Sequence, residues 1–375
     1  LIDADGTHLV DYTRIGVGTF VQSNSPQPQI AWSLISGTSV APYSGLDQFN
    51  RVVDNRWYNT ATSADLDRIQ HGYNRASNRL WRKNTVAEAA GVFLDELYAY
   101  DGVYRLARLD RGQLNSTNNG IVAGTEGFTQ AWGLDATGNW STFNQADTGG
   151  AWTLQQNRTA NAVNEITGIA GGGWIVPAYD VSGNMVTMPQ AAAPISAYSA
   201  SYDAWNRLVS VRSGSGLLMA CLYDGLYRRS TKQVAGNLRH FYYSDEWRDL
   251  EERLDGSNTF DRQFIWGLRY ADEPVARDRA NERYYAVQDA NWNVTGIADA
   301  GGAIQERYQY LAYGASIVLT ASFVIRSASV ADWEIRFAGY RWEEETALYD
   351  ARYRCFHSSI GVWLTRDPIA TMGPG

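Results

Sequence analysis

The sequence predicts an all-β protein in which stacked β-hairpins form a long twisted sheet. Aromatic residues make up 13% of the 375-residue chain and charged residues only 19%, and glycine (35) far outnumbers proline (9). Aromatic and β-branched residues that alternate between turns rich in Gly, Asn and Asp are typical of strands. Helical patterns are sparse, since only residues 84–95 suit a short helix. A motif that recurs along the chain is the strongest indication.

The recurring motif has an aromatic or apolar residue, then Asp or Asn, and then Arg or Asn five positions after the first residue. Its clearest copy is Tyr202–Leu208, which reads YDAWNRL. Motifs with fixed internal spacing that recur about every 20 to 50 residues indicate a repeat architecture. One such unit cannot bury its own apolar face, so neighbouring units must stack. The Asp or Asn of the other copies is Asp47, Asn74, Asp101, Asp135, Asn161, Asp180, Asp224 or Asp289.

Each copy of the motif is expected to form the tip of a hairpin. Asn and Gly tolerate positive φ and Asp bends the chain, while flanking segments such as Arg207–Arg212 alternate apolar and polar residues. We expect the motif Tyr to lie flat on the next hairpin with its hydroxyl near water. The Arg or Asn of the motif is expected to hydrogen-bond carbonyls of the neighbouring turn.

Charge and hydropathy exclude two kinds of partner. The net charge of −8, without any Lys- or Arg-rich run, argues against nucleic acid, because phosphate binding needs clustered cations. No stretch approaches the roughly 18 apolar residues that a transmembrane segment requires. Residues 1–5 lack the basic flank and apolar core of a signal peptide, and the chain has no initiator Met. We expect both ends to be cuts in a longer polypeptide.

Neither a metal nor a cofactor is predicted. The four histidines lie far apart and lack ligand spacing. Asp3–Thr7 resembles the start of a calcium loop without its closing Glu, so a hairpin turn is expected there. The glycines at 171–173 precede a predicted strand, whereas a phosphate-binding loop needs a helix. Cys221 and Cys355 stand in apolar surroundings and are expected to be buried, inert thiols.

Two acidic runs leave a polysaccharide-acting glycoside hydrolase open as an alternative function. Glu251–Glu252 and Glu343–Glu345 could supply paired carboxylates, about 5 to 9 Å apart beside an aromatic sugar platform. Glutamate runs are more often solvated, and alternating aromatic residues more often pack within a sheet. A module whose exposed Trp and Tyr bind surface glycans without chemistry is a third possibility. A purely structural shell would instead bury its aromatic residues and show no pocket with converging carboxylates.

The last third of the chain carries a series of specific sequence blocks. The first, Tyr284–Thr295, reads YYAVQDANWNVT, and the last, Gly361–Ile369, reads GVWLTRDPI. These blocks closely resemble the core region of RHS/YD-repeat proteins, and the recurring motif resembles that family's YD repeats. Similar segments between the two blocks are Ile297–Gly314, Arg336–Tyr340, Glu344–Asp350 and Ala351–His357.

The resemblance divides the chain into three parts. Residues 1–239 are predicted to form a YD-repeat hairpin array, residues 240–369 the RHS-repeat-associated core, and residues 370–375 a terminal tail. The boundary is placed where the motif spacing is lost and aromatic residues cluster in His240–Tyr243.

The resemblance also implies a function. It implies that the stacked β-hairpins form a spiral sheet, either a partial shell or a barrel, and that this shell encloses or presents a toxin or effector polypeptide. Surface glycans are the alternative partner. A secreted or cell-surface location is implied as well. A chain of 375 residues is expected to form an open or partial shell.

The closing block of the family can carry an aspartyl autoprotease that cuts the effector free. Its Arg and Asp correspond to Arg354 and Asp367. A carboxylate can activate water, and a guanidinium can stabilise developing negative charge. The sequence departs from the family pattern because His357 stands at the position of an Asp and Val362 at that of an Arg. His357 could carry protons near neutral pH, although the simpler interpretation is a turn residue against Phe356.

Overall fold

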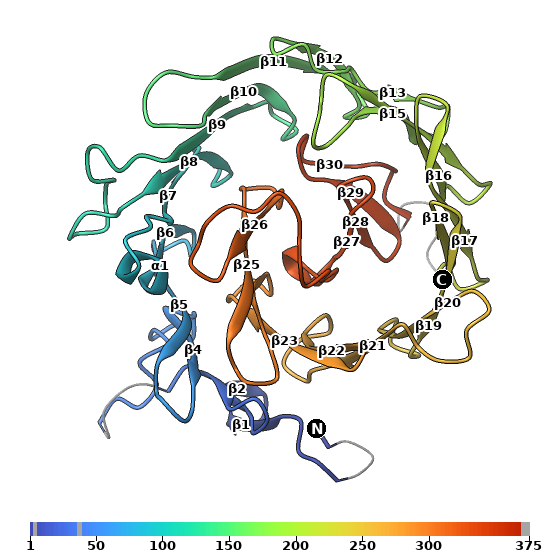
Figure 1. Ribbon diagram of the computed structural model, residues 1–375. Coiled ribbons are helices and arrows are strands. Elements are labelled where there is room, and N and C mark those ends of the chain that lie inside the picture. Colours follow the sequence, from blue (N-terminus) through green and yellow to red (C-terminus); the bar gives the residue numbers. More distant parts are fainter. Residues whose placement is uncertain (3–5, 36–39, 369–375) are drawn as a thin grey trace.

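The structure is a computed structural model that describes residues 1–2, 6–35 and 40–368, and antiparallel strands dominate it (Figure 1). Each strand pairs with the next one along the chain, so each of the three sheets is a continuous meander. The all-β fold predicted from the sequence is confirmed. The first sheet consists of β1 (Asp11–Ile15), β2 (Thr19–Ser25), β3 (Ile30–Ser33), β4 (Asp54–Asn59), β5 (Asp65–Tyr73), β6 (Arg79–Asn84), β7 (Asp95–Tyr100), β8 (Leu106–Gly112), β9 (Phe128–Leu134), β10 (Trp140–Ala146), β11 (Leu154–Ala160) and β12 (Ile166–Ala170).

The second sheet is longer and the third is short. The second consists of β13 (Ala178–Tyr179), β14 (Met185–Pro189), β15 (Ala197–Tyr202), β16 (Leu208–Ser213), β17 (Gly216–Tyr223), β18 (Arg229–Val234), β19 (Asn237–Tyr243), β20 (Asp249–Leu254), β21 (Arg262–Trp266), β22 (Pro274–Arg279), β23 (Glu282–Gln288), β24 (Val294–Ala298), β25 (Ile304–Tyr310) and β26 (Ser316–Thr320). The third, called here the inner sheet, consists of β27 (Arg341–Glu343), β28 (Leu348–Ala351), β29 (Arg354–His357) and β30 (Val362–Trp363).

The first two sheets wind into an open spiral whose end overlaps its beginning. Figure 1 shows β23 to β26 on the inner side of the strands that start the chain. Across this overlap Trp57 Nε1 donates to the carbonyl of Gln288 at 2.7 Å, and Thr295 Oγ1 donates to Asp67 at 2.6 Å. β24 is buried along its whole length because it is covered on both faces. An apolar core fills the same overlap and includes Ile30, Trp32, Trp57, Val275, Tyr285, Val287 and Ala298.

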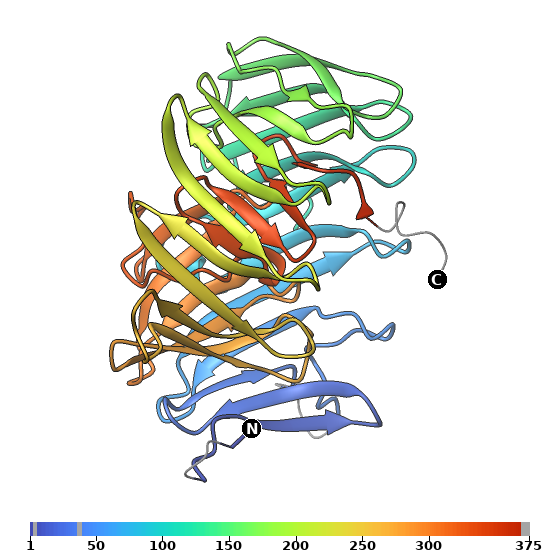
Figure 2. The same cartoon turned by 90° about the vertical axis from the view of Figure 1, so that its right-hand side faces the viewer.

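The first two sheets form a ring, called here the wall, and the inner sheet lies inside it (Figures 1 and 2). Figure 2 shows its red strands between the yellow and the teal parts of the wall. Leu348 and Leu364 pack into one apolar core with Met185 and Met219 of the wall. The C-terminal block therefore closes the interior of the spiral instead of extending the wall.

Each copy of the motif forms the same five-residue turn at a hairpin tip. The backbone N–H of Asp203 donates to the carbonyl of Arg207 at 3.1 Å, and that of Asn206 donates back to Asp203 at 3.0 Å. Asp203 Oδ1 accepts from the N–H groups of Trp205 and Arg207, and Oδ2 accepts from Arg207 Nε at 2.7 Å. Asn206 adopts a φ of 62°, which Asn tolerates better than most residues. The same two backbone bonds recur at Asp47, Asn74, Asp101, Asp135, Asn161, Asp180, Asp224 and Asp289.

The motif arginine links each turn to the next, as predicted. Arg207 Nη1 donates to the carbonyl of Asp224 at 3.0 Å, and Arg51 Nη1 donates to that of Asn74 at 2.9 Å. Because one guanidinium binds its own turn and the following one, successive hairpin tips are held in register.

The motif tyrosines link each turn to the one before it. The hydroxyl of Tyr223 donates to the carbonyl of Leu208, and that of Tyr202 to the carbonyl of Met185, both at 2.8 Å. The expectation that these hydroxyls face water is therefore wrong. The stacked preceding strand offers a carbonyl that accepts the hydrogen bond in place of water.

The remaining local predictions have different outcomes. The expected short helix is present as α1 (Thr85–Ala89), where Asn84 Oδ1 accepts from the N–H of Ala87 at 3.0 Å. Cys221 and Cys355 are free and buried as predicted, and burial raises the pKa of Cys221 to about 11. A single 3₁₀ turn, η1 (Phe337–Gly339), precedes the inner sheet.

The predicted division of the chain is not marked by a break in the sheet. Residues 239 and 240 both lie inside β19, and five-residue turns continue after them. These later turns begin at Ser244, Asp299, Leu311 and Thr320. The division therefore stays a prediction.

Two predicted features lie outside the described residues. They are the terminal tail, residues 370–375, and residues Asp3–Asp5 of the expected hairpin turn.

Candidate functional site

Arg354 and Asp367, the two residues predicted for self-cleavage, form an ion pair. Arg354 begins β29, and Asp367 follows β30 by a few residues. Arg354 Nη2 lies 3.0 Å from Asp367 Oδ2. The Arg354 guanidinium also lies 4.3 Å from the centre of the Trp363 ring on the neighbouring strand, which fixes its position. The Asp367 side chain is 47% exposed, so water reaches the carboxylate.

The ion pair lies between two cavities inside the spiral. The larger has a volume of about 570 Å³ and is bounded by the wall from β18 to β22 and by the inner sheet. The smaller, of about 440 Å³, is bounded by the hairpin tips between β9 and β14. Arg354, Trp363 and Asp367 line both cavities. The ion pair is therefore part of the lining that the two cavities have in common.

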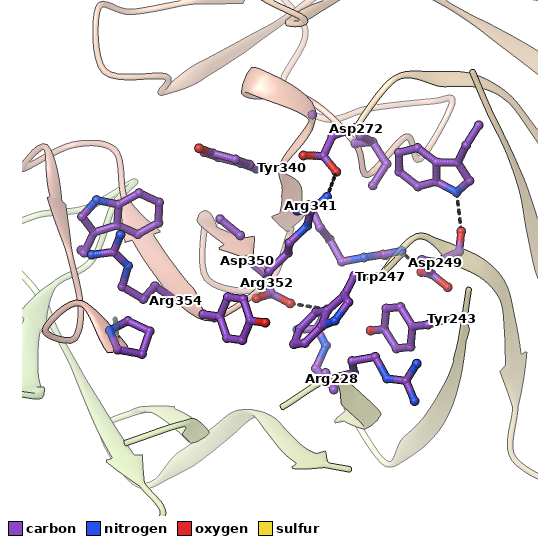
Figure 3. Close-up of a pocket in the computed structure, with 18 of the residues that line it drawn as sticks. Arg228, Tyr243, Trp247, Asp249, Asp272, Tyr340, Arg341, Asp350, Arg352 and Arg354 are labelled. Carbon is purple, nitrogen blue, oxygen red and sulfur yellow. Dashed lines mark hydrogen bonds and ion pairs between the residues drawn. The ribbon is translucent and has the colours of Figure 1, made fainter. Parts of the chain in front are cut away.

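Aromatic side chains form much of the lining of the larger cavity (Figure 3). The rings of Trp247 and Tyr353 are 4.5 Å apart, and Trp247 comes from a turn of the wall whereas Tyr353 comes from the inner sheet. This contact ties the two parts of the structure together at the rim. The other aromatic lining residues are Tyr243, Trp266, Tyr270, Tyr340 and Trp363.

Four carboxyl groups also reach the larger cavity, and an arginine neutralises each of them. The pairs are Asp249 with Arg341, Asp272 with Arg352, Asp350 with Arg229 and Asp367 with Arg354. Burial raises the pKa of Asp249, Asp272 and Asp350, although the arginines act in the opposite direction. The expectation that a shell would lack a pocket with converging carboxylates is wrong. Three of these carboxylates, Asp249, Asp272 and Asp350, serve as counter-ions at the contact between wall and inner sheet, and Asp367 pairs within the C-terminal segment.

The acidic runs fasten the inner sheet to the wall and are not solvated as expected. Glu343 is fully buried, and its carboxylate lies 2.5 Å from Lys232 Nζ and 2.6 Å from Arg229 Nη2. Burial alone would raise the pKa of Glu343, but Arg229 and Lys232 together lower this pKa to about 2. Glu252 is fully buried as well and is paired with three arginines. Only Glu344, whose side chain is 62% exposed, behaves as the sequence suggested.

Comparison with known sequences points to large bacterial proteins. No protein-family model matches the chain. The tRNA3(Ser)-specific nuclease WapA of Bacillus spizizenii is 25% identical over 245 residues, which is 65% of this chain and 10% of the nuclease. The tRNA nuclease WapA of Bacillus subtilis shows the same identity and coverage. The double-stranded DNA deaminase toxin A of Burkholderia cenocepacia is 25% identical over 356 residues, which is 88% of this chain and 23% of the toxin.

Comparison with solved structures shows which fold this is. The crystal structure of TcdB2-TccC3 has a TM-score of 0.70 at 17% identity and covers 96% of this chain and 18% of that one. The Tc holotoxin pore of Photorhabdus luminescens has a TM-score of 0.68 at 15% identity, with 94% and 17% coverage. Both contain RHS-repeat shells. The chain therefore has the fold of an RHS-repeat shell.

The chain is much shorter than the proteins it resembles. It spans 10% of each WapA nuclease and 23% of the deaminase toxin. The substrates in their names belong to those longer proteins.

His357, which occupies the position of an Asp in the RHS closing block, lies away from the ion pair. It is fully buried, and its Nε2 lies 2.7 Å from the carbonyl oxygen of Pro189. Because that carbonyl only accepts, Nε2 must donate. Burial lowers the pKa of His357 to about 4, so the ring is neutral at pH 7. His357 ends β29 and lines neither cavity, so it is no turn residue, and it is not brought to Arg354 and Asp367.

Sequence reasoning missed most of the residues that surround the ion pair. Asp350, Arg352 and Arg354 all line the larger cavity, and they stand at every second position of one hairpin. They lie on β28, in the turn and on β29, so no alternation within a single strand could have placed them on a common face. Trp247 and Arg341 could not be placed at the cavity, because distant parts of the chain bring them there.

The described residues also bear on metals and membranes. Within residues 1–2, 6–35 and 40–368, no three His, Cys, Asp or Glu side chains come together as possible metal ligands. In the same part of the chain, the helices are too short and too polar to cross a bilayer.

Proposed function

We propose that this chain is the terminal part of a shell that encloses or presents a toxin or effector polypeptide. The observation that carries the proposal is the position of Asp367 and Pro368, which line the larger cavity inside the spiral. A polypeptide that continued from Pro368 would begin in the interior, between the wall and the inner sheet. The shell would then separate this polypeptide from its surroundings until release.

The relatives support this proposal. Two of them are named as nucleases and one as a deaminase toxin, and the segment that matches this chain covers only 10% to 23% of their lengths. A separate segment can therefore carry the activity, while the shell serves as its container. A toxin acts on other cells, so we propose a secreted or cell-surface location. The absence of a nucleic-acid partner remains a prediction about this chain alone, and it rests on the net charge of −8.

We further propose that Arg354 and Asp367 cut the enclosed polypeptide free. The Asp367 carboxylate would take a proton from water, whose oxygen attacks the scissile carbonyl carbon. Arg354 would donate hydrogen bonds to the oxyanion that forms. The C–N bond then breaks, the new carboxyl group keeps the water oxygen, and Asp367 passes the proton to the leaving amine. The two cavities support this proposal because they leave room for a peptide on both sides of the pair.

This mechanism needs only one carboxylate. A two-carboxylate site would require a second acid at position 357, where this chain has a buried neutral histidine. Cleavage would therefore be slower than in a protein with both acids, but it would depend on the same Asp367.

The test uses the chain with its native downstream extension. Mass spectrometry should find a cut after purification of the wild type, and Asp367→Asn and Arg354→Gln should remain uncut while unfolding at the same temperature. Asp255→Asn is a matched control, since its side chain is 69% exposed and distant in sequence. An uncut wild type, or an Asp367→Asn protein that is cut at the same rate, would contradict self-cleavage.

Enclosure is tested separately with the uncut Asp367→Asn protein. Added trypsin should digest the downstream segment much more slowly in this protein than in the segment expressed alone. Equal rates of digestion would overturn the proposed container function, whatever the outcome of the cleavage experiment.

A glycan-directed activity is the second candidate, because the larger cavity combines aromatic rings with four carboxyl groups. Asp272 and Asp350, whose pKa values burial raises, would be the candidates for a proton donor. Turnover of model glycosides that is lost in Asp272→Asn or Asp350→Asn would support hydrolysis. Binding of glycans that is lost in Trp247→Ala would support a binding module. A wild type that neither hydrolyses nor binds a panel of bacterial glycans would exclude both.

A further inference from the structure

Arg158 on β11 is a buried cation with unused donors. Arg158 is only 5% exposed. Nε and Nη2 donate to Gln156 Oε1 at 3.1 and 2.7 Å, and Nη1 has one long contact of 3.5 Å to the carbonyl of Ile360. A guanidinium has five N–H groups. Two of them therefore find no acceptor within the described part of the chain.

No carboxylate of the described residues pairs with Arg158. Its other close neighbours are aromatic rings, with the guanidinium carbon 4.6 Å from the centre of Trp140, 5.3 Å from Phe143 and 5.6 Å from Trp174. Cation–π contacts recover only part of the hydration that a buried charge loses. Burial lowers the pKa of Arg158 to about 9, as expected for a cation without a counter-ion.

Most of the comparable arginines in this protein have a carboxylate partner. Of the seven other arginines that are buried among the described residues, six form an ion pair with Glu or Asp, namely Arg111, Arg229, Arg262, Arg277, Arg336 and Arg341. The seventh, Arg307, donates instead to the carbonyls of Ala321 and Leu66, both at 2.9 Å. Of the two buried arginines without a carboxylate partner, Arg158 is the one that lines the smaller cavity.

Arg158 lines the smaller cavity, of about 440 Å³. The other charged lining residues neutralise one another, since Arg354 pairs with Asp367 and Arg366 pairs with Glu165, both at 3.0 Å. Among the described side chains that line this cavity, Arg158 is therefore the one excess charge. The adjacent Gln156 is also incompletely satisfied, because its buried Nε2 has no partner.

We infer that the smaller cavity binds a carboxylate group through Arg158. A guanidinium presents parallel N–H groups that match the two oxygens of a carboxylate. A single excess positive charge suits a monoanion, whereas a phosphate dianion would face Glu165 and Asp367 in the same lining. Ile166 and Val362 line the cavity too and suit the carbon chain of an acid. The carboxylate could belong to a peptide or to a free small acid. The inference goes beyond the proposed shell function and does not require cleavage.

Calorimetric titration of the full chain tests the inference with small probes of known charge. N-acetylglycine and acetate should bind, and N-acetylglycinamide, which differs from the first only by its neutral amide, should not. Tighter binding of N-acetylglycine than of acetate would identify a peptide carboxylate as the natural group, and equal binding would identify a free small acid. Arg158→Gln should weaken binding about tenfold or more, because a charge-assisted hydrogen bond is lost.

Two controls separate a binding role from a structural one. Arg108→Gln removes an arginine that is 45% exposed and paired with Asp110, so its affinity for N-acetylglycine should equal that of the wild type. If Arg158→Gln fails to fold, NMR of the wild type tests the binding role instead. N-acetylglycine should shift the Arg158 Nε–H signal, and N-acetylglycinamide should not. Equal binding of acid and amide, or unchanged affinity in a folded Arg158→Gln protein, would overturn the inference.

Discussion

Replacing Asp203 with alanine tests how much one YD turn contributes to stability. The Asp203 carboxylate accepts from the N–H groups of Trp205 and Arg207 at 2.9 and 3.0 Å and from Arg207 Nε at 2.7 Å. Two backbone hydrogen bonds contribute about 2 kcal/mol at a net value of about 1 kcal/mol each. The ion pair, with side chains 13% and 20% exposed, adds about 0.5 to 1 kcal/mol after solvent screening. We expect Asp203→Ala to lower the free energy of unfolding by about 2 to 3 kcal/mol.

Asp203→Asn is the matched control, because its amide keeps an oxygen for the backbone donors and loses only the charge. It should cost about 1 kcal/mol. Urea unfolding gives the global value, and amide hydrogen exchange shows whether the loss is confined to β15 to β18, as expected for a repeat array. If Asp203→Ala costs less than about 0.5 kcal/mol, or no more than Asp203→Asn, the carboxylate does not hold the turn.

Three further outcomes follow from single contacts. Glu343→Gln should lower the free energy of unfolding by about 2 to 3 kcal/mol, because it removes the closer carboxylate of two buried cations and leaves them Asp350 at 3.4 Å and Glu345 at 2.9 Å. Glu344→Gln, at a side chain 62% exposed, should change it by less than about 0.5 kcal/mol. Similar values for the two variants in urea titrations would refute the fastening role. The pKa of His357 is about 4 in the fold and near 6.5 in an unfolded chain, so the unfolded state binds more protons between these values. Falling pH from 6.5 to 4 should therefore cost up to about 3 kcal/mol, and His357→Gln should lose that part of the pH dependence; an unchanged slope would contradict this. Gly361→Ala should lower the melting temperature by several degrees in calorimetry, because φ is 72° and a Cβ would lie 2.4 Å from Trp140 Cζ2. Gly225→Ala, which meets nothing within 4 Å, should not, and equal melting temperatures would argue against this contact.

The hairpin tips could be predicted because their determinants are local. An Asp and an Arg four residues apart define both the turn and its link to the next one, as at Asp203 and Arg207. The turns at Ser244 and Leu311 were missed because the backbone pattern does not require a carboxylate. At Ser244 the hydroxyl oxygen takes its place and accepts from the N–H of Arg248 at 3.2 Å.

The overlap of the spiral and the burial of the acidic runs could not be predicted, because both depend on residues far apart in sequence. The carbonyl of Gln288 meets Trp57, which is 231 residues away. Glu343 is buried because the wall places Arg229 and Lys232 opposite it, and no local pattern distinguishes it from the exposed Glu344.

The candidate site was predicted in its two central residues and missed in its surroundings. The resemblance to RHS closing blocks singled out Arg354 and Asp367, which the fold brings within 3.0 Å. The same resemblance also singled out His357. The side chain of His357 contacts the carbonyl of Pro189 in the wall, where burial keeps the ring neutral. The role of all three in cleavage stays a prediction.

Zero-length cross-linking with a carbodiimide tests the central claim, that the C-terminal block lies inside the spiral against its wall. The chain has only two lysines, Lys83 and Lys232, so the products are unambiguous. Lys83 lies 2.9 Å from Glu88 in the same region of the chain and serves as the internal control. Lys232 of the wall lies 2.5 Å from Glu343 and 2.9 Å from Glu345 of the C-terminal block. Mass spectrometry should find Lys232 linked to Glu343 or Glu345 in the native protein and not in urea; a native sample with the Lys83–Glu88 link but without either of these would contradict the account.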